Sequence, residues 1–88
     1  MRELYVNTQK ETGSEAQLKF DYYILIDQME VNGGLFCESY GIKIVGAEES
    51  ISIPNLTTSI ARIDGLMELL IRNFVTPTTA MDVVNDWL

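Results

Sequence analysis

Histidine is absent from this sequence and cysteine occurs once. Without histidine the chain cannot form a histidine-containing catalytic triad, an imidazole zinc site or a histidine pH switch. A single cysteine, Cys37, excludes an intramolecular disulfide and a cysteine-cluster metal site, and a lone free thiol is typical of a reducing cytoplasm. We therefore expect a protein that is not an enzyme and that holds no metal or cofactor.

Basic residues are also few: six lysines and arginines stand singly against thirteen acidic residues, giving a net charge of −7. Binding to nucleic acid or to an anionic membrane surface needs clusters of positive charge, so we expect neither partner. No apolar run reaches the roughly 20 residues that span a bilayer, and the first residues lack the apolar stretch of a signal peptide. These features predict a cytoplasmic location.

The 88 residues contain 47% hydrophobic side chains, which is enough for one folded core. We expect a single domain over residues 1–88, with a β-sheet portion at 1–54 and a helical hairpin at 58–88. A chain of this length hides only roughly 60–65% of the surface that its unfolded form exposes, so oligomerisation would add useful stability.

Hydrophobic residues alternate with period two over the first two-thirds of the chain. Residues 18–29 have apolar even positions and several charged odd positions, which is typical of an antiparallel strand with one buried face. Asn32-Gly33 predicts a type I′ hairpin turn, and residues 35–45 form the return strand. Its apolar face carries Phe36, Tyr40, Ile42 and Ile44.

Two shorter strands complete the predicted sheet. Residues 4–6 form the first one, before a polar segment at 9–15 that has the composition of a loop. Residues 50–53 form the last one, which ends at Pro54 because proline cannot donate to a strand ladder. Gly41, inside the long return strand, suggests a bulge or a close approach of another backbone segment.

From residue 58 onward the hydrophobic period changes to 3.6 residues, which predicts a helix. Its apolar arc consists of Ile60, Ile63, Leu66, Met67, Leu70, Ile71 and Phe74. Thr76 and Pro77 suit the cap and the first position of a second helix. The predicted fold class is α+β: an antiparallel four-stranded meander sheet followed by two C-terminal helices packed on one face.

Helices on one side leave the other side of such a sheet open to solvent, yet large apolar residues fall on that open face. A cluster of this kind suggests a contact surface, although single exposed hydrophobic residues are common. We therefore predict a protein-interaction module whose partner is unknown. The simplest partner is a second copy of the same chain, which would give a homodimer through the open face. On this hypothesis Tyr23→Asp or Leu25→Asp shifts a homodimer toward monomer without unfolding it. The predicted interaction surface comprises Tyr5, Tyr23, Leu25, Met29, Cys37 and Val45.

A second hypothesis is a small-molecule or metal-binding protein with a pocket between the sheet and the helices. Tyr40, Glu38 and Asp64 are the polar groups that could line it. Glu38 stands in an otherwise apolar set of positions, and Asp64 borders the apolar arc of its helix. Each carboxylate would then need a hydrogen bond, a cation or solvent, because an unpaired buried charge is costly.

Several segments resemble a small protein family of Gram-positive Firmicutes that is known only as a domain of unknown function (DUF6514-like). The resemblance covers roughly residues 18–88 and depends on the order and spacing of short motifs. It implies a small intracellular bacterial protein and assigns no functional residue. The motifs are Tyr22-Tyr23-Ile24-Leu25, Tyr40-Gly41-Ile42-Lys43-Ile44, Leu66-Met67-Glu68-Leu69-Leu70, and Pro77 with Asp82-Val83-Val84-Asn85-Asp86-Trp87-Leu88.

Overall fold

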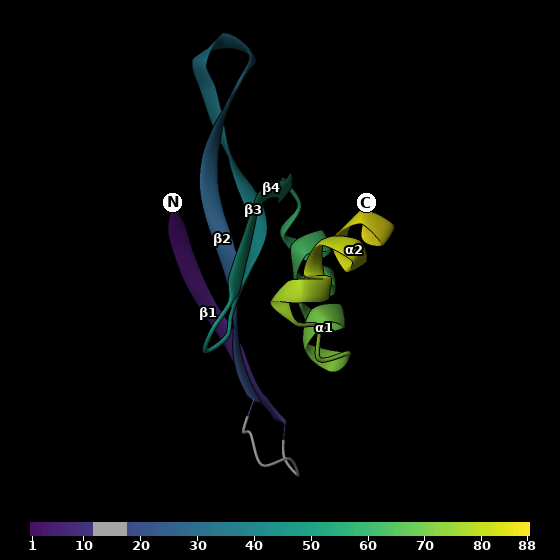
Figure 1. Ribbon diagram of the computed structural model, residues 1–88. Coiled ribbons are helices and arrows are strands. Elements are labelled where there is room, and N and C mark those ends of the chain that lie inside the picture. The colour runs from purple at the N-terminus through teal and green to yellow at the C-terminus, as the bar shows by residue number, and fades with distance from the viewer. Residues whose placement is uncertain (12–17) are drawn as a thin grey trace.

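The computed structural model describes residues 1–11 and 18–88, in which four strands are followed by two helices (Figure 1). Each strand pairs antiparallel with the next in the order β1-β2-β3-β4, and both helices contact the sheet. The predicted α+β meander is thereby confirmed. The elements are β1 (Arg2–Glu11), β2 (Leu18–Val31), β3 (Leu35–Val45), β4 (Ser50–Thr57), α1 (Ile60–Arg72) and α2 (Pro77–Trp87).

The core lies between the sheet and the helices. α1 contacts β2, β3 and β4, whereas α2 contacts β4. The Tyr22 hydroxyl on β2 donates to the carbonyl of Val75, between the helices, at 2.7 Å. Arg62 near the start of α1 stacks 4.4 Å from the ring centre of Trp87 at the end of α2, so the helices run antiparallel. The buried core residues are Phe20, Tyr22, Ile24, Tyr40, Ile42, Ile44, Ile53, Ile63, Leu66, Met67, Leu70, Val75, Ala80 and Val84.

The fourth strand is longer than predicted, because β4 continues past Pro54 to Thr57. Ile53 pairs with Ile42 and Thr57 pairs with Tyr40, so three β4 residues between them stand opposite Gly41 alone. A Cβ at Gly41 would lie 2.5 Å from the Cα of Pro54, and only glycine fits there. The bulge lets the strand carry a proline without losing a ladder hydrogen bond at that point.

The first strand also differs from the prediction. β1 extends to Glu11, so residues 9–11 pair with β2 instead of forming the expected loop. Residues 12–15 of that predicted loop lie outside the described residues. The register shifts between Tyr5 and Asn7, which makes Val6 the extra residue of a β-bulge.

The hairpin between β2 and β3 is confirmed, but its turn is not the predicted two-residue type. Val31 pairs with Leu35, which leaves a three-residue loop over Asn32–Gly34. The positive φ angles fall on Gly33 (80°) and Gly34 (77°) and not on Asn32. Two adjacent glycines accept these angles without steric strain, so they take over the role that was expected of Asn-Gly.

This hairpin projects well beyond the helices (Figure 1). We call its projecting end, residues 28–38, the arm. Every residue from 28 to 36 is exposed, whereas the same two strands are largely buried where α1 covers them. The arm and the helix-covered part of the sheet are therefore two distinct regions.

Candidate interaction surfaces

The open face of the sheet brings two of the predicted surface residues together. Tyr5 on β1 lies opposite Tyr23 on β2, and their rings meet edge to face with centres 5.7 Å apart. The ammonium group of Lys43 lies 5.8 Å from the centre of the Tyr23 ring. Tyr5 is 54% exposed, so this pair presents an aromatic surface to solvent.

Leu25 does not belong to that exposed surface, and here the sequence interpretation is wrong. Its side chain is 1% exposed although it lies on the face away from the helices. Glu3 and Gly41 are its register partners on the two sides. Lys43 on β3 reaches Glu3 on β1 with an Nζ–Oε1 distance of 2.9 Å, so this ion pair spans β2 and covers Leu25.

The remaining predicted residues lie at opposite ends of the sheet. Met29 and Cys37 are register partners within the arm, where Met29 is exposed and Cys37 is half-buried. Val45 pairs with Asp21 at the other end of β3 and is half-buried. The six residues therefore form no single patch, and their role in binding stays a prediction.

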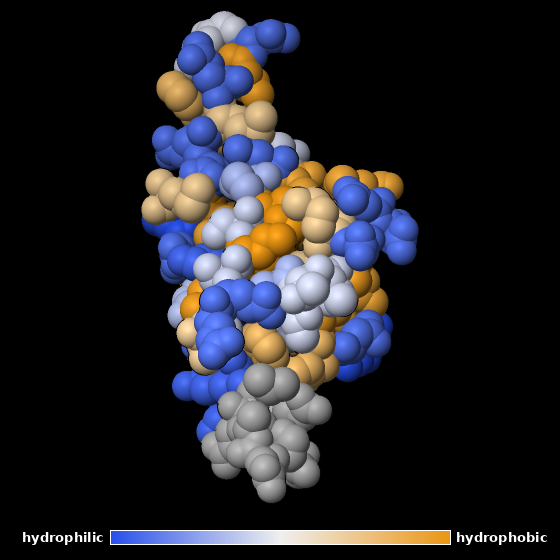
Figure 2. All heavy atoms as spheres, viewed as in Figure 1, coloured by the Kyte–Doolittle hydropathy of each residue, from blue (hydrophilic) through white to orange (hydrophobic). Residues whose placement is uncertain are grey.

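The arm carries apolar residues that the sequence interpretation did not assign to a site. Leu35 and Phe36 are 67% and 65% exposed, and Val31 lies directly opposite Leu35. Hydrophobic residues stand among hydrophilic ones at this end of the molecule (Figure 2). The lengths of the predicted elements could have revealed this surface. A strand rises about 3.3 Å per residue and a helix 1.5 Å, so the long hairpin extends past the ends of the helices.

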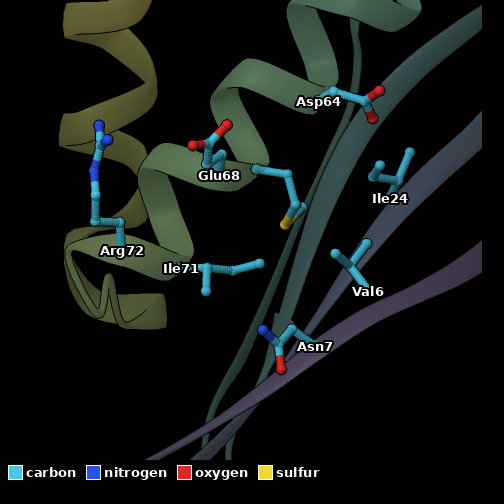
Figure 3. Close-up of a pocket in the computed structure, with 8 residues that line it drawn as sticks. Val6, Asn7, Ile24, Asp64, Glu68, Ile71 and Arg72 are labelled. Atoms are coloured by element: carbon cyan, nitrogen blue, oxygen red, sulfur yellow. The ribbon is translucent and has the colours of Figure 1, made fainter.

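A groove lies on the other side of the sheet, between β1 and α1 (Figure 3). Its volume is about 430 Å³. Asp64 and Glu68 stand one helical turn apart on its α1 side, and Val6 and Asn7 form its β1 side. The lining residues are Val6, Asn7, Ile24, Asp64, Met67, Glu68, Ile71 and Arg72.

Of the three polar groups expected in a pocket, the structure brings only Asp64 to this groove. The Tyr40 hydroxyl instead donates to Glu38 Oε1 at 3.3 Å, and Glu38 Oε2 lies 2.6 Å from Arg2. Burial raises the pKa of Tyr40, the negative charge of Glu38 and its hydrogen bond raise it further, and Arg2 opposes the change. Glu38 and Tyr40 therefore form a separate polar cluster with Arg2 at the base of the arm.

The described residues contain no group of three or more carboxylate, histidine or cysteine side chains placed to hold a metal ion. None of the helices among them is long and apolar enough to cross a bilayer.

Fold and surfaces together define a small two-layer α+β protein with one uncovered sheet face and a projecting hairpin. The chain belongs to a family of unknown function, DUF6514, whose model matches residues 1–88. The match takes in the first strand as well as the region that carried the resemblance. No curated protein and no solved structure matches the chain.

Proposed function

We propose that this protein is a non-enzymatic protein-interaction module and that it binds a protein partner with the arm. The supporting observation is the exposure of four large apolar side chains on one short hairpin: Met29, Val31 and Leu35 on the open face and Phe36 on the opposite face. Met29, Val31 and Leu35 are neighbours on one face, and exposed apolar patches on small proteins mark contact surfaces more often than isolated hydrophobic residues do.

Size and position both suit the arm to this role. Fully burying a leucine or phenylalanine side chain contributes roughly 1.5–3 kcal/mol, so Leu35 and Phe36 can supply much of the free energy of binding. The arm is a paired hairpin, which lowers the conformational entropy lost on binding. Its reach beyond the helices makes the apolar residues accessible to a recessed partner surface.

The charges near the arm indicate what kind of partner fits. Glu30 lies opposite Phe36, and Glu38 lies opposite Gln28 at the base of the arm. Arg2 already pairs with Glu38. Acidic groups beside apolar ones favour a partner with an apolar pocket flanked by basic residues, which also matches the net charge of −7.

Site-specific photo-crosslinking in the native cell tests this proposal. A benzophenone amino acid replaces Phe36 in one variant and the exposed helix residue Met81 in a matched control. We expect a discrete crosslinked product from position 36 that Leu35→Ser weakens and that position 81 does not give. Absence of that product, or the same products from both positions, would contradict the proposal.

The groove favours a second candidate function, the binding of a small organic cation. Its apolar floor suits a hydrocarbon portion, and the carboxylates of Asp64 and Glu68 suit a positive head group. Alkylamines should raise the melting temperature by several degrees, whereas divalent cations tested beside them should not. The variant Asp64→Asn with Glu68→Gln should lose that shift, and a panel without any shift would exclude this function.

A further inference from the structure

β1 stands at one end of the strand order, and nothing among the described residues pairs with its outer edge. Large apolar side chains on both faces of this strand are exposed: Leu4 and Val6 toward the helices, Tyr5 away from them. An exposed edge of this kind is a template for a further strand. The arrangement of β1 itself indicates which strand fits.

The residues of β1 that direct their main-chain groups outward can be identified. Within a strand, residues that share a face point their N–H and C=O groups to the same edge. The N–H of Thr8, an open-face residue, donates to its neighbour Asn7 Oδ1 at 2.7 Å, so it points away from β2. The outward set is therefore the open-face set: Glu3, Tyr5, Thr8 and Lys10.

The third strand supports this assignment independently. Gly46 directly follows β3 and continues its helix-facing set of positions. Its N–H donates to the carbonyl of Glu49 at 2.8 Å and so points toward β4. The open-face residues of β3 consequently direct their main-chain N–H and C=O groups toward β2. Because β1 and β3 both pair antiparallel with β2, β1 and β3 run parallel to each other. The open-face residues of β1 therefore direct their main-chain groups the same way as those of β3, which for β1 is away from the sheet.

The outward set is symmetric about the bulge. Val6 and Asn7 both face α1, as Figure 3 shows, and the alternation restarts on either side of them. A twofold axis between Val6 and Asn7 relates Glu3 to Lys10 and Tyr5 to Thr8. An edge bulge normally deters pairing because it breaks the alternation of faces, but a bulge centred on the axis keeps like faces together.

We propose that β1 pairs antiparallel with β1 of a second copy of this chain about that axis, joining two sheets into one of eight strands. Glu3 and Tyr5 then lie opposite the second copy's Lys10 and Thr8, and Leu4 lies opposite its Gln9. Each hydrogen-bonded pair exchanges two bonds, so the contact makes about eight main-chain hydrogen bonds. Any other alignment of the two β1 strands across the bulge places an open-face residue of one copy opposite a helix-facing residue of the other. A shift of one residue, for example, brings Tyr5 opposite the second copy's Asn7.

Charge complementarity supports the same alignment. Lys10 is exposed, and Glu3 is exposed while its carboxylate accepts hydrogen bonds from Lys43 of the same chain. In the proposed dimer the ammonium group of each Lys10 faces the carboxylate of the other copy's Glu3, and these opposite charges lie directly across the new strand pair. Two such contacts form, one on each side of the axis. Tyr5 gains the second copy's Thr8 as a neighbour on the open face.

Cysteine crosslinking tests the alignment. In a Cys37→Ser background, a Leu4→Cys chain mixed with a Gln9→Cys chain should form a heterodimeric disulfide in a glutathione buffer. These two positions form a non-hydrogen-bonded pair, whose Cα atoms lie about 4.5 Å apart, within the range of a disulfide. The control mixture of Leu4→Cys with Asn7→Cys lies on the same face but out of register and should crosslink at least tenfold less. Equal crosslinking in both mixtures, or none in either, overturns the proposal.

Sedimentation equilibrium tests the charge contacts. Lys10→Glu should weaken the dimer about tenfold, since it replaces two attractive contacts by repulsive ones. Lys19→Glu is the matched control: Lys19 is the β2 partner of Lys10, also exposed, and one strand further from the axis. It should change the dissociation constant less than about threefold. A wild-type chain that stays monomeric up to about 0.5 mM, or equal effects of both variants, contradicts the proposal.

This dimer and the partner-binding arm can fail separately. The dimer depends on β1, whereas the arm variants lie in the β2–β3 hairpin. Loss of the photo-crosslinked product with an intact dimer would remove only the proposed function, and the reverse result would remove only the dimer.

Discussion

Two phenylalanines on the same hairpin show how differently its two ends are used. Phe20 on β2 and Phe36 on β3 occupy the helix-facing set of positions, yet Phe20 is 5% exposed and Phe36 is 65% exposed. Phe20 packs edge to face against Phe74, just after α1, with ring centres 5.6 Å apart. Phe36 lies in the arm, beyond the helices. The strand pattern decides the face of a side chain, whereas the reach of the second layer decides its burial.

The open face shows the same distinction by other means. Leu25 and Met29 lie on one strand and one face, but only Leu25 is buried. Leu25 is covered by the ion pair between the flanking strands and by the backbone of the β4 bulge, whereas a helix covers the buried residues on the other face. Long polar side chains can cover apolar surface with their methylene stems, so burial does not require an apolar layer.

The largest expected effect comes from the two phenylalanines. Phe20→Ala should lower the free energy of unfolding by about 3–5 kcal/mol because it leaves a cavity in the core. Phe36→Ala should change it by less than about 0.5 kcal/mol, since its side chain is already in solvent. Urea denaturation followed by circular dichroism measures both. Similar losses for the two variants would show that the arm is packed in solution.

The open-face pair should show a somewhat smaller difference. Leu25→Ala is expected to cost about 2–4 kcal/mol, and Met29→Ala less than about 0.5 kcal/mol. Leu25→Asp should unfold the chain and not merely shift an oligomer toward monomer. A buried carboxylate at this position would lack a positive partner of its own, because Lys43 is already paired with Glu3. A folded, stable Leu25→Asp protein would contradict the burial of this residue.

The smallest expected effect concerns the bond between the two layers. Tyr22→Phe removes the hydroxyl that donates to Val75 and should cost about 1–2 kcal/mol, because a buried carbonyl loses its partner. Burial raises the pKa of Tyr22 above its ordinary value of 10.0. The unfolded chain therefore releases this proton first, so the contribution of Tyr22 to the free energy of unfolding is constant below pH about 10 and falls as the pH rises further.

Denaturation curves between pH 8 and about 11 check this direction. Tyr22→Phe should flatten the fall, although a part remains because the pKa of Tyr40 is raised as well. A wild-type stability that increases with pH above about 10 would contradict the assignment. Tyr40→Phe is the matched variant, since its hydroxyl contacts Glu38 at the base of the arm and not the helix layer.

Much of the fold followed from local patterns. Alternation along residues 18–45 placed Ile24, Ile42 and Ile44 on the helix-facing side, and all three are buried there. The Thr76-Pro77 pair correctly marked the start of α2. The predicted surface was less accurate: Tyr5 and Tyr23 do meet on the open face, but Leu25 is covered and Met29 lies apart in the arm.

Sequence alone determined the strand faces, the hairpin, the helix stripes and the negative charge, because each depends on neighbours a few residues away. Only the tertiary structure decided where α1 ends relative to the hairpin, which salt bridge crosses Leu25, and how the bulge at Val6 resets the edge of β1. Those features depend on segments far apart in the chain, such as Glu3 and Lys43, and on a single extra residue that shifts the pairing without changing the local hydrophobic pattern.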